Sequence, residues 1–170
     1  DRTATGGRLH FASAMTMTDR VDGDDASVGA SYLELAEVLM KHGSETDKDL
    51  RELWSRIVFN ILVSNTDDHL RNHGFLLDPG RGWRLSDAYD MNPVAHADGL
   101  KLNITDADNA LDLELAREVA EYFRVGHNDA AEIIERFQGV VSQWPKVADA
   151  VGLSKREQDN MAPAFRLSGN

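Results

Sequence analysis

The strongest constraint on the fold is an apolar stripe in the first half of the chain. Between Leu50 and Leu62, apolar residues recur at helical spacing, at positions 50, 53, 54, 57, 58, 61 and 62. A stripe of this kind occupies one face of an α-helix, and that face must be buried. The sequence therefore predicts a buried central helix that runs directly into the polar segment SNTDDH.

Capping signals and shorter stripes predict further helices on both sides. Ser31 with Glu34 is typical of a capping box, and Gly43 of the end of that helix. Thr46 with Asp49 repeats the capping signal before the central helix. Three later helices are predicted: one lined by Leu115, Val119, Tyr122 and Phe123 and ended by Gly126; one lined by Ile133, Ile134, Phe137, Val140, Val141 and Trp144 and ended by Pro145; and a short one capped by Ser154 and Glu157.

The hydrophobic period changes at Gly74. The segments GFLLD and GWRLS flank PGR, a pattern typical of a β-hairpin with a Pro-Gly turn. We expect strands at about Gly74–Leu77 and Trp83–Leu85. The predicted fold class is mainly α with a small β-hairpin, in a single domain spanning residues 1–170.

Composition narrows the classes of function. Eighteen Lys and Arg residues against 29 Asp and Glu residues give a net charge of −11, which argues against direct binding of nucleic acid. No segment approaches the ~18 apolar residues of a membrane span, and no signal peptide opens the chain, so we expect no membrane partner. The absence of cysteine excludes disulfides and thiolate metal sites, and it is compatible with a reducing cytoplasm.

Candidate functional residues lie immediately before and after the predicted hairpin. Asp67 and Asn72 precede its first strand, and Asp90 follows its second. Phosphoryl transfer from ATP needs a carboxylate that receives the acceptor's proton, and oxygen ligands that hold Mg²⁺ against the phosphates. Protein kinases arrange a catalytic loop, a hairpin and a metal-binding Asp in this order. The pattern therefore favours phosphoryl transfer, with the hairpin returning Asp90 so that it shares a cation with Asn72.

Other interpretations of the same residues remain open on spacing alone. Asp67, Asn72 and Asp90 are also residue types that mark loops, left-handed turns and caps. Asp68, His69 and His73 suggest a zinc site, because two histidines four positions apart can share a helical face. The segment leads into a strand, however, and it contains no Glu that could act as the base of a zinc hydrolase. Zinc is the less favoured reading.

Two stretches around these residues resemble a known family. FNILVSNTDDHLRNHGFLL followed by WRLSDAYDMNP is similar to the signature of HipA-like serine/threonine kinases, the toxins of bacterial type II toxin–antitoxin pairs. The likeness extends to GGRLHFASAMTM near the start, and to LKLNITDADNALDLELAREVAEYF and VVSQWP in the second half. The resemblance implies a kinase-like C-terminal lobe of the HipA type.

Residue by residue, the resemblance implies distinct roles. Asp67 matches the catalytic Asp of the family, and Asn72 and Asp90 match the residues that hold Mg²⁺ and, through it, the cofactor ATP. His69 matches a histidine of the same cofactor-binding loop, where we expect it to structure the loop by bracing carboxylates.

Nothing in the chain resembles the family's phosphate-binding loop or its ATP-anchoring lysine, which lie in an N-terminal lobe. Lys41 and Lys48 lie at predicted helix ends, and Lys101 follows the proposed metal ligand Asp90. We therefore expect the chain to be the C-terminal lobe of a longer cytoplasmic kinase, binding ATP poorly by itself.

The resemblance also implies partners. They are the protein's own N-terminal lobe, a protein substrate of which aminoacyl-tRNA synthetases are the family's example, and a small helix-turn-helix antitoxin. The alternative from a different class is a non-catalytic protein-interaction module that keeps the kinase-like fold. The intact set of Asp67, Asn72 and Asp90 favours the kinase.

Overall fold

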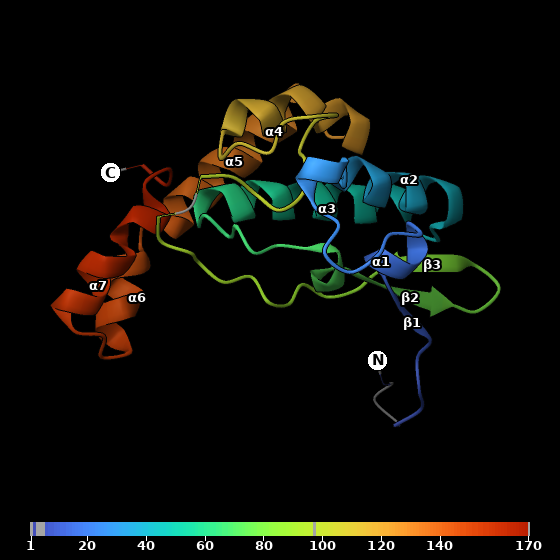
Figure 1. The fold of residues 1–170 in the computed structure, drawn as a ribbon, viewed down its shortest axis with the longest axis horizontal. Helices are drawn as coiled ribbons and strands as arrows, with labels where there is room; N and C mark the ends of the chain where they lie inside the picture. Colours follow the sequence, from blue (N-terminus) through green and yellow to red (C-terminus); the bar gives the residue numbers. More distant parts are fainter. Residues whose placement is uncertain (1, 3–5, 97, 170) are drawn as a thin grey trace.

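The computed structural model describes residues 2, 6–96 and 98–169. The long helix α3 (Thr46–Leu62) runs through the middle of the molecule, and the other elements pack around it (Figure 1). Helices α2 (Tyr32–His42), α4 (Leu113–Val119) and α5 (His127–Val141) contact α3, as does the 3-10 helix η3 (Ala120–Phe123). A small sheet contacts α3 through its third strand. The predicted fold class, mainly α with a small β element, is confirmed.

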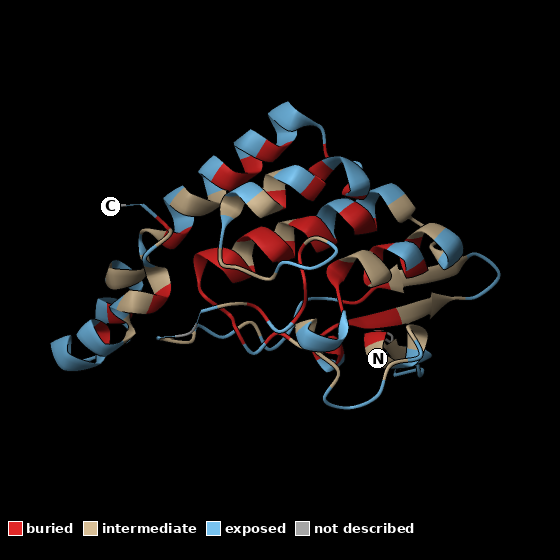
Figure 2. Ribbon diagram, turned by 45° about the horizontal axis from the view of Figure 1, so that its top comes forward, coloured by how far each residue is buried: buried red, intermediate tan, exposed pale blue. Residues whose placement is uncertain are grey.

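Burial follows the apolar stripe predicted from the sequence. Buried residues extend along most of α3 (Figure 2). The indole Nε1 of Trp54 donates a hydrogen bond of 2.7 Å to the carbonyl oxygen of Ala116, which ties the central helix to α4. The predicted core residues that are buried are Leu53, Trp54, Ile57, Val58, Ile61, Phe123 and Ile134. Phe137 is only partly buried, and its ring packs edge-on against Phe59.

The predicted hairpin is confirmed, and a third strand joins it. Strands β2 (Gly74–Asp78) and β3 (Gly82–Leu85) pair antiparallel, and β1 (Phe11–Ser13) pairs antiparallel with the other edge of β2. Sequence analysis missed β1 because three residues are too few to show a strand period. After β1 the short helix α1 (Ala14–Met17) begins, where the Ala14 N–H donates to the His73 carbonyl oxygen.

Some predicted helix ends are confirmed and one is wrong. Capping boxes form at Ser31 and Ser154, and Gly43 caps the end of α2. The predicted capping by Thr46 and Asp49 does not form, because Thr46 is already the first residue of α3. Its hydroxyl donates instead to the carbonyl oxygens of Leu39 and Gly43. Asp49 is buried and binds β3, as described below.

Two helices end elsewhere than predicted. The helix expected to reach Gly126 tightens into η3 and is capped by Arg124 in the left-handed conformation. Helix α5 ends at Val141. Pro145 lies in the first turn of a new helix, α6 (Trp144–Ala150), where a backbone N–H has no partner within the helix, so proline is tolerated. The exposed side chains of Tyr122 and Val140 therefore do not belong to the core stripes.

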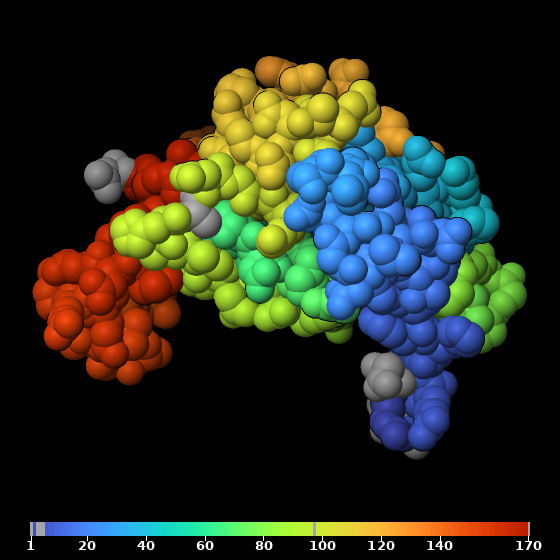
Figure 3. Space-filling model, viewed as in Figure 1, coloured from blue at the N-terminus to red at the C-terminus, as the bar shows by residue number. Residues whose placement is uncertain are grey.

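Two segments project from this body (Figure 3). Helices α6 and α7 (Lys155–Met161), followed by the 3-10 helix η4 (Ala162–Phe165), form one projection, and residues 6–10, before β1, form the other. Two further 3-10 helices are η1 (Ala26–Val28) and η2 (Leu70–Asn72). Among the residues that the structure describes, no helix is long and apolar enough to span a membrane.

The hairpin requires glycine at position 82, both for its backbone conformation and for lack of space. Its φ of +134° lies in a region that residues with a Cβ rarely adopt, and a Cβ added there would lie 2.4 Å from the His42 carbonyl oxygen. We expect Gly82→Ala to lower the free energy of unfolding by about 3 kcal/mol, through strain and this backbone clash. Gly80→Ala is the matched control, since Gly80 also has positive φ but nothing lies within 4 Å of its Cβ position. It should cost about 1 kcal/mol. Equal urea midpoints for the two variants would contradict this account.

Candidate active site

The predicted catalytic loop leaves α3 through a sharp turn at Ser64. Ser64 is buried and has φ +51°, in the left-handed region. Its hydroxyl donates to the carbonyl oxygen of Ala164 at 2.8 Å and accepts from Arg166 Nη1 at 3.1 Å. The start of the loop is thereby fixed to η4, a segment far away in the sequence.

A buried carboxylate, that of Asp68, holds the centre of the loop. Asp68 is 2% exposed, and its Oδ2 accepts three hydrogen bonds: from Tyr32 Oη at 2.5 Å, Asn60 Nδ2 at 2.8 Å and His73 Nε2 at 2.8 Å. Asn65 Nδ2 adds a bond to Asn60 Oδ1 at 3.0 Å. Because these donors come from α2, from α3 and from His73, just before β2, one carboxylate oxygen ties the loop to two helices and to its own end. Spacing alone gave no sign of this role.

Asp67, next to Asp68, faces outward. Its side chain is exposed and makes no hydrogen bond or ion pair with the described residues. The backbone carbonyl of Asp67 accepts a bond from Asn72 Nδ2 at 3.3 Å, which turns the amide nitrogen of Asn72 toward the loop and leaves its Oδ1 without a hydrogen bond from the described part of the chain. Adjacent residues thus have opposite environments: Asp68 is enclosed by donors, and Asp67 is free to meet a ligand.

Within the described part of the chain, the imidazole of His69 bonds to no carboxylate, contrary to the expected bracing role. Its Nε2 lies 3.3 Å from Arg71 Nη2, and its carbonyl oxygen accepts the Asn72 N–H at 2.8 Å. The bracing imidazole is that of His73. His69 therefore shapes the loop through its backbone, which begins the η2 turn.

The segment that carries Asp90 runs back beside this loop. Tyr89 Oη donates to the Arg71 carbonyl oxygen at 2.7 Å, and the Val94 N–H donates to the Ser64 carbonyl oxygen at 3.2 Å. Tyr89 and Met91, the neighbours of Asp90, line one small cavity, too tight to admit a water molecule, together with Asn72. The hairpin therefore brings the chain around Asp90 to the Asn72 loop.

Asp90 itself is exposed and has φ +57°. Its Oδ1 accepts from Asn92 Nδ2 at 2.7 Å, and its second carboxylate oxygen has no partner among the described residues. The side-chain atoms of Asn72, Asp90 and Asp67 that are available to bind a metal ion are all oxygens, the ligand type that Mg²⁺ prefers. The residues present thus fit a magnesium ion in chemistry.

The zinc interpretation has less support from the geometry. His73 directs its Nε2 to Asp68, while the Nε2 of His69 lies against Arg71. Over residues 2, 6–96 and 98–169, no three His, Cys, Asp or Glu side chains gather in a way that could hold a metal ion.

Three buried polar residues of α3 support the site, and sequence analysis missed them. Asp49 accepts bonds from the Leu85 N–H at 2.9 Å and from Arg84 Nε at 3.0 Å, which fixes β3. Arg56 donates to the carbonyl oxygen of Ser86, and Asn60 to Asp68. Polar residues on or next to the apolar stripe were the signal that could have revealed these contacts. A polar side chain is buried only where it has a hydrogen-bonding partner.

Comparison with solved structures identifies the type of fold. The chain superposes with a TM-score of 0.72 on a chain in a solved complex of HipA, HipB and operator DNA from the Shewanella oneidensis toxin–antitoxin system. The sequences are 16% identical, and the match covers 94% of this chain and 42% of that chain.

A family model then assigns the chain. The model described as the HipA-like C-terminal domain matches residues 1–144, and the chain belongs to this kinase-like family. A curated Haemophilus influenzae protein named "Putative kinase" is 30% identical over 84 residues, which make up 48% of this chain. The match spans only 24% of that relative's length.

The opposite environments of the two adjacent carboxylates lead to a stability prediction. Asp68→Asn replaces a carboxylate that accepts three buried bonds with a neutral amide, so we expect a loss on the order of 3 kcal/mol in the free energy of unfolding. Asp67→Asn changes an exposed group and should alter stability by less than about 0.5 kcal/mol. Urea unfolding followed by circular dichroism measures both. Similar losses in the two variants would contradict the assignment of Asp68 as the anchor.

Tyr32 should make the free energy of unfolding depend on pH. Burial, reinforced by the neighbouring Asp68 carboxylate, raises the pKa of Tyr32 well above its usual value. The unfolded chain ionises this phenol near pH ~10, so its contribution to stability is complete below that pH and declines as the pH rises above it. Unfolding free energies measured from about pH 8 to about pH 11 should fall less steeply for Tyr32→Phe than for wild type. The slope should not vanish, because burial also raises the pKa of Tyr89 and Tyr122. Identical slopes would exclude this role for Tyr32.

Proposed function

We propose that this chain is the C-terminal lobe of a serine/threonine protein kinase of the HipA type, which transfers the γ-phosphate of ATP to a protein hydroxyl. The observation that carries the proposal is the hydrogen bond from Tyr89 to the Arg71 carbonyl oxygen, with the small cavity that Tyr89 and Met91 share with Asn72. It supports a site in which Asp90 and Asn72 act together. Membership in a kinase-like family supports the use of ATP and Mg²⁺.

Asp67 is proposed to receive the proton of the acceptor hydroxyl. Its carboxylate is exposed and makes no hydrogen bond or ion pair with the described residues, while the buried Asp68 beside it fixes the loop backbone. A carboxylate held on a rigid loop needs little rearrangement before it accepts a proton. Asp67 thus acts as the base, and the Asp68 network orients it.

Asn72 and Asp90 are proposed to hold Mg²⁺ through the Asn72 Oδ1 and the Asp90 carboxylate. The bond from Asn72 Nδ2 to the Asp67 carbonyl supports this, because it fixes which end of the amide is available. The bound cation would neutralise charge on the ATP phosphates. His69 contributes by shaping the turn that presents Asn72.

The rest of the site is proposed to lie in an N-terminal lobe with a glycine-rich phosphate loop and a strand lysine. The chain covers only 42% of the superposed HipA-type chain, which supports a longer protein. A small helix-turn-helix antitoxin is the proposed partner, by analogy with the solved complex that contains HipB. An aminoacyl-tRNA synthetase is the proposed class of substrate, and the cytoplasm the proposed location. The net charge of −11 does not favour DNA binding by this lobe itself.

Radiolabelled phosphate transfer tests the assignment of roles. Full-length wild type should label a Ser or Thr target, and Asp67→Asn should abolish transfer at every Mg²⁺ concentration, because the base is lost. Asp90→Asn removes a metal ligand, so high Mg²⁺ should restore part of its activity. This fragment alone should transfer little, since catalysis here depends on positioning and electrostatics shared with the other lobe.

Asp87→Asn is the matched control: Asp87 is exposed in the same segment, and the proposal gives it no role. Transfer by full-length Asp67→Asn equal to wild type would overturn the catalytic assignment. No transfer by wild type to any protein target, in a chain that still binds its partner, would favour the non-catalytic interaction module.

A further inference from the structure

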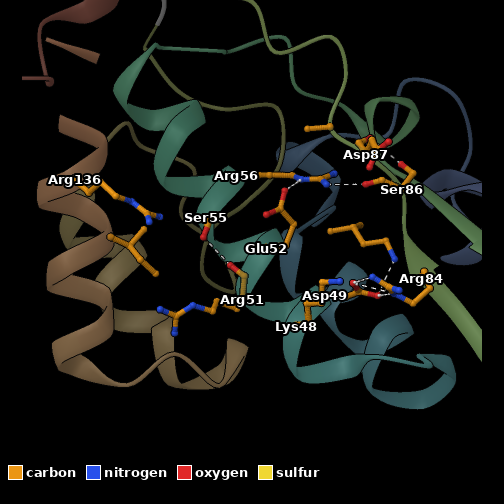
Figure 4. Close-up of a pocket in the computed structure, with 13 residues that line it drawn as sticks. Lys48, Asp49, Arg51, Glu52, Ser55, Arg56, Arg84, Ser86, Asp87 and Arg136 are labelled. Carbon is orange, nitrogen blue, oxygen red and sulfur yellow. Dashed lines mark hydrogen bonds and ion pairs between the residues drawn. The ribbon is translucent and has the colours of Figure 1, made fainter. Parts of the chain in front are cut away.

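Arg56 is a buried cation on α3 that the proposed chemistry does not use. It is 5% exposed, although arginine is rarely buried without strong partners. Its Nε donates to Glu52 Oε1 at 2.9 Å, and its Nη2 donates to the Ser86 carbonyl oxygen at 2.7 Å (Figure 4). Its Nη1 is buried and has no hydrogen-bond partner among the described residues.

The two engaged nitrogens differ in what they contribute. Glu52 lies one turn before Arg56 on the same helix, and half of its side chain is exposed, so this ion pair adds little stability. The bond to Ser86 is buried and joins α3 to the chain where it leaves β3. This bond is therefore the contact that offsets the desolvation cost of burying the guanidinium.

The guanidinium also lies near residues of the two segments that carry the proposed metal ligands. Arg56 lines the same small cavity as Asn72, His73, Tyr89 and Met91. Besides Arg56 Nη1, a second buried atom at this cavity, His73 Nδ1, has no hydrogen-bond partner in the part of the chain that the structure describes. Arg56 thus lies between the two segments that carry Asn72 and Asp90.

We propose that Arg56 is a positioning residue of this site: by fixing the chain at Ser86 against α3, it sets where Asp90 lies relative to Asn72. This inference rests on the proposed function. Mg²⁺ requires nearly ideal octahedral geometry at ~2.0–2.1 Å, so a small shift of one ligand weakens binding strongly. Residues that orient metal ligands typically change metal affinity by about 10–100-fold when replaced.

Metal binding by the full-length protein tests the inference without relying on activity. Mn²⁺ serves as the probe, titrated in the presence of a non-hydrolysable ATP analogue and followed by electron paramagnetic resonance. Arg56→Met should raise the dissociation constant for Mn²⁺ by about 10–100-fold. Arg56→Lys keeps one donor for the Ser86 carbonyl and should lie between Arg56→Met and wild type. If Arg56→Met does not fold, Arg56→Lys provides the same comparison.

Amide hydrogen exchange gives a second readout. Residues 87–91 should exchange faster in Arg56→Met than in wild type, while the loop of residues 67–73, held by the Asp68 network, should not change. Arg51→Met is the matched control: Arg51 lies on the same helix, but it is exposed and pairs with Asp129 on α5. It should leave both the metal affinity and the exchange unaltered.

Two further variants separate the possible outcomes. Val141→Ala removes a buried side chain on α5, remote from the site in sequence, and it shows what destabilisation alone does to Mn²⁺ affinity. An equal loss of affinity in Val141→Ala and Arg56→Met would overturn the positioning role, as would unchanged affinity in Arg56→Met. Asp90→Asn in the same titration tests the proposed function. If Asp90→Asn weakens Mn²⁺ binding and Arg56→Met does not, only the positioning role fails; if Asp90→Asn has no effect, the proposed metal site itself fails.

Discussion

The structure depends on a row of buried polar groups along one otherwise apolar helix. Asp49, Arg56 and Asn60 of α3 each bind a different segment: Asp49 binds β3, Arg56 binds the chain after β3, and Asn60 binds the loop before β2. Apolar contacts would bury the same helix in several rotations and registers, because they have little directionality. Hydrogen bonds in a low-dielectric interior are directional, and leaving one unmade is costly. These three side chains therefore fix the position of the loop and of the hairpin relative to the helix.

What could be predicted from the sequence was structure with a strong local signal. The stripe from Leu50 to Leu62 repeats often enough to define a helix, and the Pro-Gly turn defines a hairpin. Strand β1 was missed because its stability comes from pairing with β2, which a local pattern cannot show. Asp49 was interpreted as part of a capping signal because it follows Thr46 by three positions, the spacing of a capping box. Its tertiary partners, Arg84 and the Leu85 N–H, instead draw it into the interior.

For the site, spacing could select the loop but could not assign roles to adjacent residues. Asp67 and Asp68 are the same residue type, side by side in a segment without a period, and only the fold distinguishes them. The resemblance selected Asp67 for catalysis, and the structure places Asp68 among three donors and leaves Asp67 exposed. The same holds for the two histidines, since His73 rather than His69 bonds to the buried carboxylate. Roles that depend on which side of a loop faces the core require the three-dimensional structure.

Backbone conformation adds an independent argument that the loop and the segment around Asp90 form one unit. Ser64 and Asp90 both adopt positive φ, which costs a residue with a Cβ about 1 kcal/mol or more. Such conformations persist where surrounding contacts determine them, and they cluster at functional sites. Here Ser64 begins the loop, and its carbonyl oxygen accepts a bond from Val94, just beyond Asp90. The residue that begins the loop is therefore bonded to the chain four residues after Asp90. Glycine at position 64 would avoid this cost, but it would lose the hydroxyl that bonds to the Ala164 carbonyl oxygen of η4.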